Sequence, residues 1–182
     1  MATRIELRKV QVLGDTPAPF DAPIQLHVEL EVFEQVPRDA VDVSFTWSPV
    51  WDFSVDQQLD EMEVGPFTTL GKHKFTIESD PPDVTQIPDP TGPTALIVSF
   101  KYKSQEFLHI GYNVIVNCEG EMPDVFTSAS QLTREIGRCY PRLREITWDT
   151  KDPAESMSLE ESSDVTSEDL EEAPGKRTRL EG

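Results

Sequence analysis

Hydrophobic and polar residues alternate along much of the chain, most regularly between Pro23 and Phe33. An alternation with period two is typical of a β-strand that buries one face and exposes the other. The same pattern predicts eight strands, at Ile5–Leu13, Pro23–Phe33, Val41–Trp47, Leu59–Val64, His73–Ile77, Thr94–Tyr102, Glu106–Val116 and Leu143–Trp148. Eight strands in the first 150 residues, with no long helix between them, predict an all-β sandwich.

Proline and glycine mark the connections between these strands. Most of the 15 prolines lie between the predicted strands, where a missing amide hydrogen does not interrupt a sheet. One helix is predicted from Ser128 to Gly137, with Ser128 or Thr127 as its N-cap and Gly137 as its end. Leu132 and Ile136, four positions apart, would share one face of this helix.

The strands at Thr94–Tyr102 and Glu106–Val116 carry apolar residues on both faces. If Leu96, Val98, Phe100 and Tyr102 point inward, Ala95 and Ile97 point outward, and on the second strand the outward set is His109, Gly111, Asn113 and Ile115. A mixed apolar and polar outer face is typical of a protein-docking surface. The alternative is that a helix or loop of the same chain covers this face.

Composition changes near residue 150. Residues 1–150 carry 24 of the 34 acidic and 12 of the 16 basic residues, whereas residues 151–182 carry the other 10 and 4 and no aromatic residue. A segment with so few apolar side chains cannot offset its ordering entropy by burial. We therefore expect one folded domain at 1–150, followed by a disordered, acidic, Ser-rich tail at 151–182.

The formal net charge is −18 at pH 7. Nucleic acids and anionic lipids require a basic surface, so this charge argues against direct binding to either and favours a basic protein partner. Cys118 and Cys139 lie far apart and near no cluster of histidines, which argues against a disulfide framework or a zinc site. No apolar run is long enough for a membrane span or a signal peptide, so we expect no membrane association.

Catalytic motifs are absent from the sequence. His27, His73 and His109 are scattered among strands, and no hydrolase, metal or phosphate-binding signature accompanies them, so we expect neither an enzyme nor a cofactor. Asp56 and Asp60 could serve as the acid and base of a hydrolase. The alternative is that both carboxylates belong to a solvated loop face.

The run from Tyr102 to Val114 (YKSQEFLHIGYNV) resembles a run in the anti-silencing-function histone chaperones. Other pieces resembling this family follow in the same order, at 10–13, 17–20, 56–60, 64–66, 87–89 and 141–143. The resemblance spans about residues 5–150. It implies an immunoglobulin-like β-sandwich, no catalysis, and binding of a histone H3–H4 dimer that blocks H3-mediated tetramer formation, while the H4 tail adds a strand to a sheet edge.

The resemblance also assigns site residues. Asp56 matches an acid that pairs with an H3 arginine, and Ala95 matches an apolar position at the centre of the H3 patch. Trp47 matches an apolar contact position, with the alternative that it is a core tryptophan. The full set of implied histone-binding residues is Trp47, Asp56, Asp60, Ala95, Ile97, His109, Tyr112, Asn113 and Arg142.

Three positions depart from the family pattern. His109 replaces an arginine, Asn113 replaces a tyrosine, and Arg38 replaces an acid in a region through which the family binds other chaperones. A basic chaperone hairpin would therefore meet a weaker field near Arg38. The alternative to a histone chaperone is an immunoglobulin-like acidic adaptor for another basic protein.

The resemblance further implies regulation of the tail by a Tousled-like kinase. The candidate phosphorylation sites are Ser156, Ser158, Ser162, Ser163, Thr166 and Ser167, and phosphorylation would add negative charge there. The alternative is a tail that only aids solubility. A short basic cluster at Lys176–Arg179 could act as a nuclear import signal, so we expect a nuclear protein, with a cytoplasmic pool as a further option.

Overall fold

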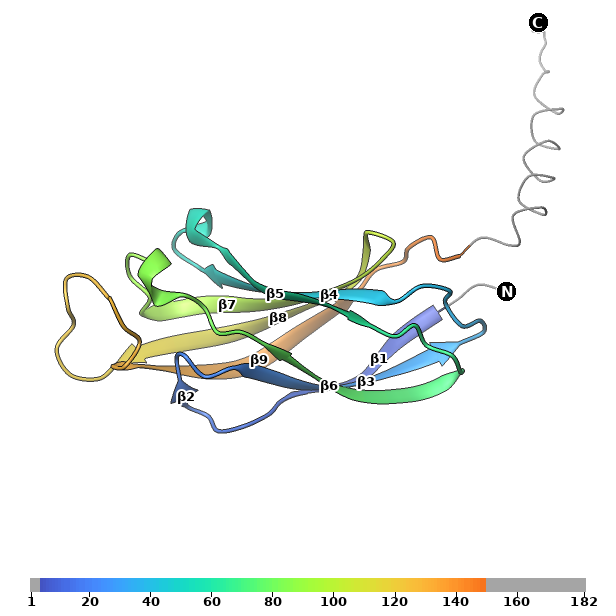
Figure 1. Ribbon diagram of the computed structural model, residues 1–182, viewed down its shortest axis with the longest axis horizontal. Helices are drawn as coiled ribbons and strands as arrows, with labels where there is room; N and C mark the ends of the chain where they lie inside the picture. The colour runs from blue at the N-terminus through green and yellow to red at the C-terminus, as the bar shows by residue number, and fades with distance from the viewer. Residues whose placement is uncertain (1–3, 150–182) are drawn as a thin grey trace, which may run out of the picture. The chain divides into compact units, whose positions relative to one another are not determined.

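Two antiparallel sheets form the two layers of the fold in a computed structural model, which describes residues 4–149 (Figure 1). The smaller sheet has the order β1 (Arg4–Val12), β3 (Ile24–Phe33), β6 (Gly71–Ser79). The larger has the order β2 (Ala18–Pro19), β9 (Leu132–Leu143), β8 (Gln105–Cys118), β7 (Gly92–Tyr102), β4 (Val41–Pro49), β5 (Gln57–Val64). Two 3₁₀ turns, η1 (Phe53–Val55) and η2 (Val84–Gln86), lie in the connections. The predicted all-β, immunoglobulin-like sandwich is confirmed.

The core lies between the two sheets and is built from the inward positions of the alternating strands. On β3 every second residue from Ile24 to Val32 is buried, as the alternation predicts. On β7 the buried apolar residues are Leu96, Val98, Phe100 and Tyr102, with Thr94 and the outward Ser99 also buried, and on β8 the buried set includes Leu108, Ile110 and Val114. The predicted inward faces of these three strands are therefore confirmed, and their outward faces are fixed at the same time.

A tight turn joins β7 to β8 and sets their register. Lys103 (φ 49°) and Ser104 (φ 66°) both have positive φ, as a two-residue hairpin loop of the primed type requires. The turn pairs Tyr102 with Gln105, and after one irregularity between Phe100 and Lys101 the ladder runs on to Gly92 and Val116. The outward residues of the two strands consequently stand in fixed cross-strand pairs.

Two predicted elements are wrong. Residues 128–137 form no helix, because β9 begins at Leu132 and continues the larger sheet beside β8. The predicted strand at Leu143–Trp148 is also wrong, since β9 ends at Leu143 and the following residues form no strand. Trp148 instead contributes its ring to the core, with centroids 5.0 Å from those of Tyr102 and Phe107.

In residues 4–149 no helix is both long and apolar enough to cross a membrane. The tail expected at 151–182, with its six candidate phosphorylation sites, lies outside the described residues.

Candidate functional site

The outer face of the larger sheet presents apolar side chains that no other part of the described chain covers completely. Ala95 on β7 is the cross-strand partner of Asn113 on β8, and Ile97 is the partner of Gly111. Gly111 is in turn the partner of Tyr140 on β9, whose side chain is 52% exposed. Ala95 and Ile97 are half-buried, and Asn113 is exposed. We call Ala95, Ile97, Gly111, Asn113 and Tyr140 the outer patch.

Three large apolar side chains directly after β4 extend the exposed apolar surface. Val50, Trp51 and Phe53 are 53%, 48% and 70% exposed, and the Val50 amide donates to the carbonyl of Pro93 at the start of β7. Their segment is fixed by Asp52, whose carboxylate accepts from the amide and hydroxyl of Ser54. These hydrogen bonds from Ser54 hold the pKa of Asp52 below its usual value. The exposure of these side chains is therefore built into the local structure.

A row of polar side chains borders the outer patch on the side of the β7–β8 turn. We call Ser99, Glu106, His109 and Arg142 the polar row. His109 is the cross-strand partner of Ser99 on one side and of Arg142 on the other. The Glu106 carboxylate accepts from Ser99 Oγ at 2.5 Å and from His109 Nδ1 at 3.2 Å. Burial raises the pKa of Glu106, but these hydrogen bonds and the charges of His109 and Arg144 outweigh it, so this pKa is lowered.

The two candidate carboxylates on and before β5 differ in their placement. Asp56 is exposed and caps the end of η1, where its amide donates to the carbonyl of Phe53, the first residue of that turn. Asp60 is the cross-strand partner of the buried Phe45, so it lies on the inward side of this edge strand, separate from the outer patch. Other acids share the outward side, because Glu61 pairs with Ser44, and Glu63 with Asp42.

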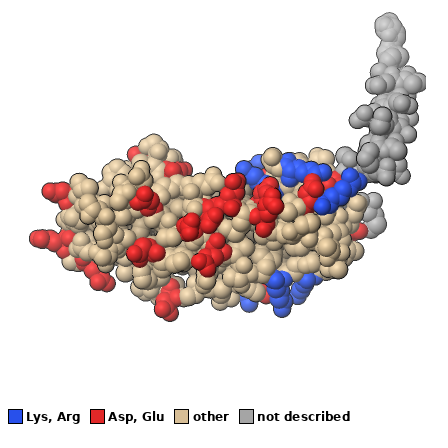
Figure 2. All heavy atoms as spheres, viewed as in Figure 1, with Lys and Arg blue, Asp and Glu red and all other residues tan. Residues whose placement is uncertain are grey.

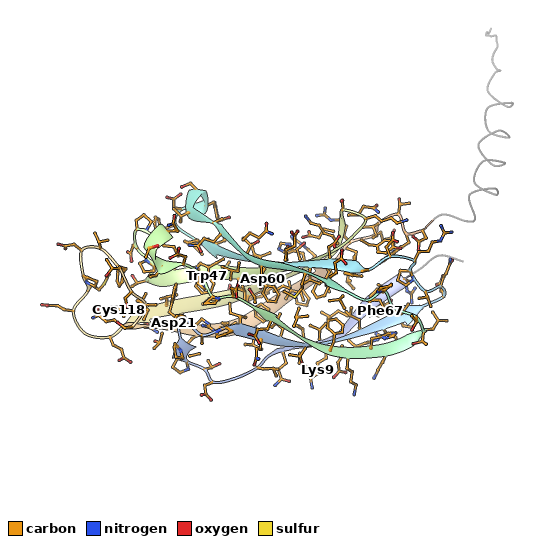
Figure 3. The ribbon with its side chains drawn as sticks, viewed as in Figure 1. Lys9, Asp21, Trp47, Asp60, Phe67 and Cys118 are labelled. Carbon is orange, nitrogen blue, oxygen red and sulfur yellow. The ribbon has the colours of Figure 1, made fainter. Side chains whose placement is uncertain are left out.

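Two residues expected to contact a partner belong to the core instead. Trp47 is fully buried between the sheets (Figure 3) and packs edge-on against Phe20 at a centroid distance of 5.6 Å, which supports the alternative of a core tryptophan. Tyr112 is 3% exposed and shares the inward face of β8 with Ile110 and Val114. The expectation that Tyr112 lies on the contact surface is therefore wrong, because its neighbours Gly111 and Asn113 take the outward positions.

The edge of β9 offers unpaired main chain next to the outer patch. β8 covers one side of β9, whereas β2 covers the other side only at Thr133 and Arg134. Within the described part of the chain, no further strand pairs with residues 135–143 on that side. An open edge of this kind can accept an added strand.

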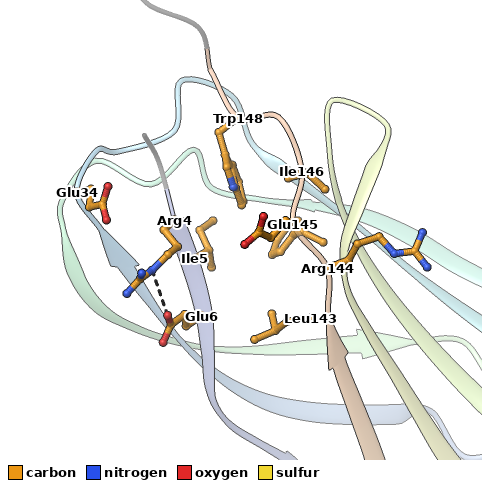
Figure 4. Close-up of a pocket in the computed structure, with 10 residues that line it drawn as sticks. Arg4, Ile5, Glu6, Glu34, Leu143, Arg144, Glu145, Ile146 and Trp148 are labelled. Carbon is orange, nitrogen blue, oxygen red and sulfur yellow. Dashed lines mark ion pairs between the residues drawn. The ribbon is translucent and has the colours of Figure 1, made fainter. Parts of the chain in front are cut away.

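A pocket of about 470 Å³ lies at the end of this open edge (Figure 4). Its apolar wall includes Ile5, Leu143 and Trp148, and an Arg4–Glu6 ion pair of 3.1 Å lies on its rim. Leu143 is 52% exposed although its cross-strand partner Leu108 is buried. The pocket therefore provides apolar surface where a strand added along β9 would end.

The segment around Arg38, expected to bind other chaperones, carries a partly neutralised charge. The Asp39 carboxylate lies 3.6 Å from Lys103 Nζ, and the Asp39 amide donates to the Tyr102 hydroxyl at 3.1 Å. The field of Asp39 is thus offset by a lysine as well as by the neighbouring Arg38. Both features weaken the attraction of a basic partner to this segment.

Charge is unevenly spread over the body. In the face that Figure 2 shows, Asp and Glu side chains extend over the left part and the middle, whereas Lys and Arg gather in the right half.

Among residues 4–149 no group of three or more His, Cys, Asp or Glu side chains is placed to hold a metal ion.

Tyr140, the exposed aromatic residue of the outer patch, was not predicted from the sequence. Tyr140 lies in a region where a helix and then a loop were expected, so its alternation with Arg138 and Arg142 was not interpreted as a strand. That period-two pattern is the signal that could have identified it. The cluster Val50, Trp51 and Phe53 was missed because it shows no periodicity.

Comparison with known proteins places the chain in a family. The model of the family described as "ASF1 like histone chaperone" matches residues 2–149. A Caenorhabditis elegans protein named "Probable histone chaperone asf-1" is 33% identical over 93% of the chain, and the match spans 64% of that relative's length. The "Histone chaperone asf1a-B" of Xenopus laevis is 31% identical over 85% of the chain and 82% of its own length. The "Histone chaperone asf1" of Drosophila melanogaster is 33% identical over 80% of the chain and 70% of its own length.

The family model covers the whole sandwich, including all the strands that carry the outer patch and the open edge. The chain belongs to the ASF1-like histone chaperone family.

Proposed function

We propose that this protein is a histone chaperone that binds a histone H3–H4 dimer through the outer face of its larger sheet. Binding there covers the H3 surface that would otherwise build the tetramer, and the protein hands the dimer over during nucleosome assembly and disassembly. The single observation that best supports this proposal is an exposed apolar patch that lies beside an open strand edge on one sheet. The family of the chain supports histones as the partner.

The outer patch supplies the apolar part of the proposed contact. Ala95, Ile97 and Tyr140 offer apolar area to a pair of amphipathic histone helices, and Asn113 adds a hydrogen-bonding group beside them. The exposed Val50, Trp51 and Phe53 enlarge the area available. Trp47 and Tyr112 support this surface from the core side.

Charged groups supply orientation. Asp56 is exposed and can pair with a histone arginine, whereas His109 and Arg142 occupy adjacent outward positions on β8 and β9. Asp60, at the edge of the sheet, contributes a longer-range field. The net charge of −18 attracts a basic dimer and shields it from DNA.

The open edge of β9 is the proposed seat of the H4 tail. A strand that pairs with residues 135–143 gains main-chain hydrogen bonds there, and its last side chain reaches the apolar pocket at Leu143 and Trp148. Pro141 lies in this strand, and edge strands tolerate proline because one side needs no amide donor.

The same proposal extends to the remaining partners and to the tail. A Tousled-like kinase phosphorylates the serines and threonine between Ser156 and Ser167, the protein acts in the nucleus, and other histone chaperones bind it at the Arg38 segment with reduced strength. We propose a binding function without a catalytic step or a cofactor, carried by a domain at 1–150 and a tail at 151–182.

A reconstitution with purified histones tests the proposal. Full-length protein is mixed with an H3–H4 dimer, and the mass of the complex is measured by size-exclusion chromatography with light scattering at increasing salt. We expect one chaperone per histone dimer, in a complex that persists at ionic strengths that screen exposed charges. Complete loss at moderate salt would favour the acidic adaptor for another basic protein.

A variant pair locates the contact. Ala95→Arg places an unpaired cation in the outer patch and should abolish co-elution with the dimer. Thr76→Arg adds the same charge to the exposed outward face of β6 in the other sheet, so it should co-elute like the parent. Equal binding by both variants would show that the outer patch is not the contact surface.

A further inference from the structure

The larger sheet exposes a second group of apolar side chains, at the end of its outer face that is remote from the polar row. On β8, Ile115 is 51% exposed, and its cross-strand partner on β7 is the exposed Pro93. The carbonyl of Pro93 accepts from the amide of Val50, and the exposed Trp51 and Phe53 follow Val50 in the chain. We call Val50, Trp51, Phe53, Pro93 and Ile115 the apolar extension.

The apolar extension continues the outer patch along two neighbouring strands. Pro93 lies two positions before Ala95 on β7, so both residues are on the outward side of that strand. Ile115 lies two positions after Asn113 on β8 and is outward for the same reason. The pair Pro93 and Ile115 therefore stands next to the pair Ala95 and Asn113, and the two groups form one surface.

The segment after β4 joins this surface. Val50 lies two positions after Ser48, which is the cross-strand partner of Ala95 on β7 and shares its outward side. In Figure 1, η1, which begins at Phe53, projects from the larger sheet on the side away from β1, β3 and β6. A partner that covers Ala95 therefore meets the apolar extension if its own surface continues toward β4.

Trp51 and Phe53 can supply contact area that the middle of the outer patch does not offer. Ala95 has a single methyl group and Gly111 has no side chain, whereas a Trp or Phe ring can bury roughly 150–250 Å². Aromatic anchors of this kind commonly dominate the energy of protein interfaces. The backbone that carries them is already ordered, because the Asp52 amide donates to the carbonyl of Pro49, so docking orders little additional chain.

Carboxylates near the two rings select the kind of partner. Residues 48–60 contain Asp52, Asp56 and Asp60 and neither Lys nor Arg. Hydrogen bonds from Ser54 lower the pKa of Asp52, so this carboxylate stays ionised. Apolar surface bordered by carboxylates complements apolar surface bordered by basic residues. It disfavours a symmetric contact with a second copy, in which the same carboxylates would face each other.

We infer that Trp51 and Phe53 form a second aromatic anchor of the histone contact, on the β4 side of the outer face, whereas Tyr140 lies on the β9 side. This inference rests on the proposed histone binding. It names the occupant of the apolar extension as the part of the H3–H4 dimer surface that continues past Ala95 toward β4. The affinity for histones then depends on residues that the outer patch does not include.

Dissociation constants test the inference. The affinity of full-length protein for the H3–H4 dimer is measured for the parent, Trp51→Ser, Phe53→Ser and the control Leu70→Ser. Leu70 is 51% exposed, close to the 48% of Trp51, but it lies directly before β6 of the smaller sheet. We expect Trp51→Ser and Phe53→Ser each to weaken binding about tenfold, and Leu70→Ser to change it less than about twofold.

Trp51→Phe separates a direct contact from a structural effect. It keeps an aromatic ring, so it should bind within about threefold of the parent, and its thermal midpoint should match that of the parent because position 51 is exposed. Acrylamide quenching of tryptophan fluorescence adds a direct readout, since Trp47 is buried and Trp148 is half-buried. We expect the histone dimer to reduce quenching in the parent, and to reduce it less than half as much in Trp51→Phe.

The outcomes distinguish the inference from the proposed function. If Ala95→Arg abolishes binding whereas Trp51→Ser and Phe53→Ser bind like the parent, the inference is wrong and the proposed function stands. If the parent binds no histone dimer, both are wrong. Light scattering on the free protein examines the other occupant. A parent dimer that Trp51→Ser converts to a monomer of unchanged histone affinity would assign the apolar extension to a second copy and overturn the inference.

Discussion

The guanidinium of Arg134 donates a hydrogen bond of 2.6 Å to the carbonyl oxygen of Pro19, 115 positions earlier in the chain. The same group also donates to the carbonyls of Phe20, Ala22 and Pro23, and only 4% of Arg134 is exposed. Burial lowers the pKa of Arg134. One buried cation thus fixes the short β2 against β9 and determines where the open edge begins.

Arg134→Met should lower the free energy of unfolding by about 3 kcal/mol, because four carbonyl oxygens lose their donor inside the protein. Urea unfolding followed by tryptophan fluorescence measures this change. Arg138→Met, at an exposed position of the same strand, should stay within about 0.5 kcal/mol of the parent. Equal effects of the two substitutions would contradict the anchoring role of Arg134.

Trp47→Ala should destabilise the fold by about 3–5 kcal/mol, since it removes a fully buried ring that packs against Phe20. Below its own unfolding transition, the variant should still bind the H3–H4 dimer, because Trp47 does not reach the outer face. Thermal unfolding and a binding assay at low temperature separate the two effects. Loss of histone binding by a folded Trp47→Ala variant would indicate that Trp47 belongs to the contact surface after all.

Tyr140→Ala should weaken histone binding by about 1–3 kcal/mol, as expected for an exposed aromatic residue that becomes buried in an interface. Isothermal titration calorimetry with the H3–H4 dimer measures the loss. Tyr112→Phe is the control, because its hydroxyl is buried with no hydrogen-bond partner among the described residues, so its removal should leave binding unchanged and should not lower stability. A stronger effect of Tyr112→Phe than of Tyr140→Ala would contradict the assignment of the two faces.

Glu106→Gln should reduce stability at pH 7 but have little effect at pH 3. The folded-state pKa of Glu106 is lowered, so its carboxylate stabilises the fold above the ordinary carboxyl pKa, and this contribution is lost as the pH falls through the folded-state value. We expect a loss of about 1 kcal/mol or less at pH 7, because solvent screens part of the interaction. Urea unfolding at both pH values provides the measurement. A pH-independent loss would show that the charge of Glu106 is immaterial.

Strand periodicity predicted most of this fold because a strand that buries one face alternates apolar and polar residues along the sequence. The segments at β3, β7 and β8 alternate regularly, and the residues predicted to point inward on them are buried; β4 was predicted as a strand without assigned faces. The outward positions of Ala95 and Ile97 followed from the same pattern. Those predictions depend only on local sequence and on a core that covers one face.

β9 was misassigned because its pattern contains a buried charge. Leu132 and Ile136 fit a helical spacing, and a charged residue such as Arg134 between them is typical of a solvent-exposed position. In the fold Arg134 points inward and finds four carbonyls from residues 19–23, contacts that no local pattern encodes. The two-residue β2 was missed for the same reason, since it exists only through its pairing with β9.

Alignment to a family motif assigned Tyr112 to the surface, although strand alternation alone places it inward beside Ile110 and Val114. A shift of one position along a strand reverses the face of every side chain, so a motif match that is ambiguous by one residue cannot decide exposure. The register that the β7–β8 turn sets between the two strands does decide which side chains are exposed. The structure therefore places Asn113, rather than Tyr112, beside Ala95.

The unpaired edge of β9 also bears on whether the free protein stays monomeric. A strand that can recruit a foreign peptide could equally recruit a second copy of itself, as edge strands do in aggregation. The edge exposes Glu135, Arg138 and Arg142, and Pro141 within it has no amide hydrogen to donate. Two copies aligned edge to edge would bring like charges together at registers that oppose Arg138 and Arg142, whereas the amide hydrogen that Pro141 lacks is missing for any added strand. The charges along this edge thus disfavour self-pairing at those registers, while a strand with a different charge pattern does not meet that repulsion.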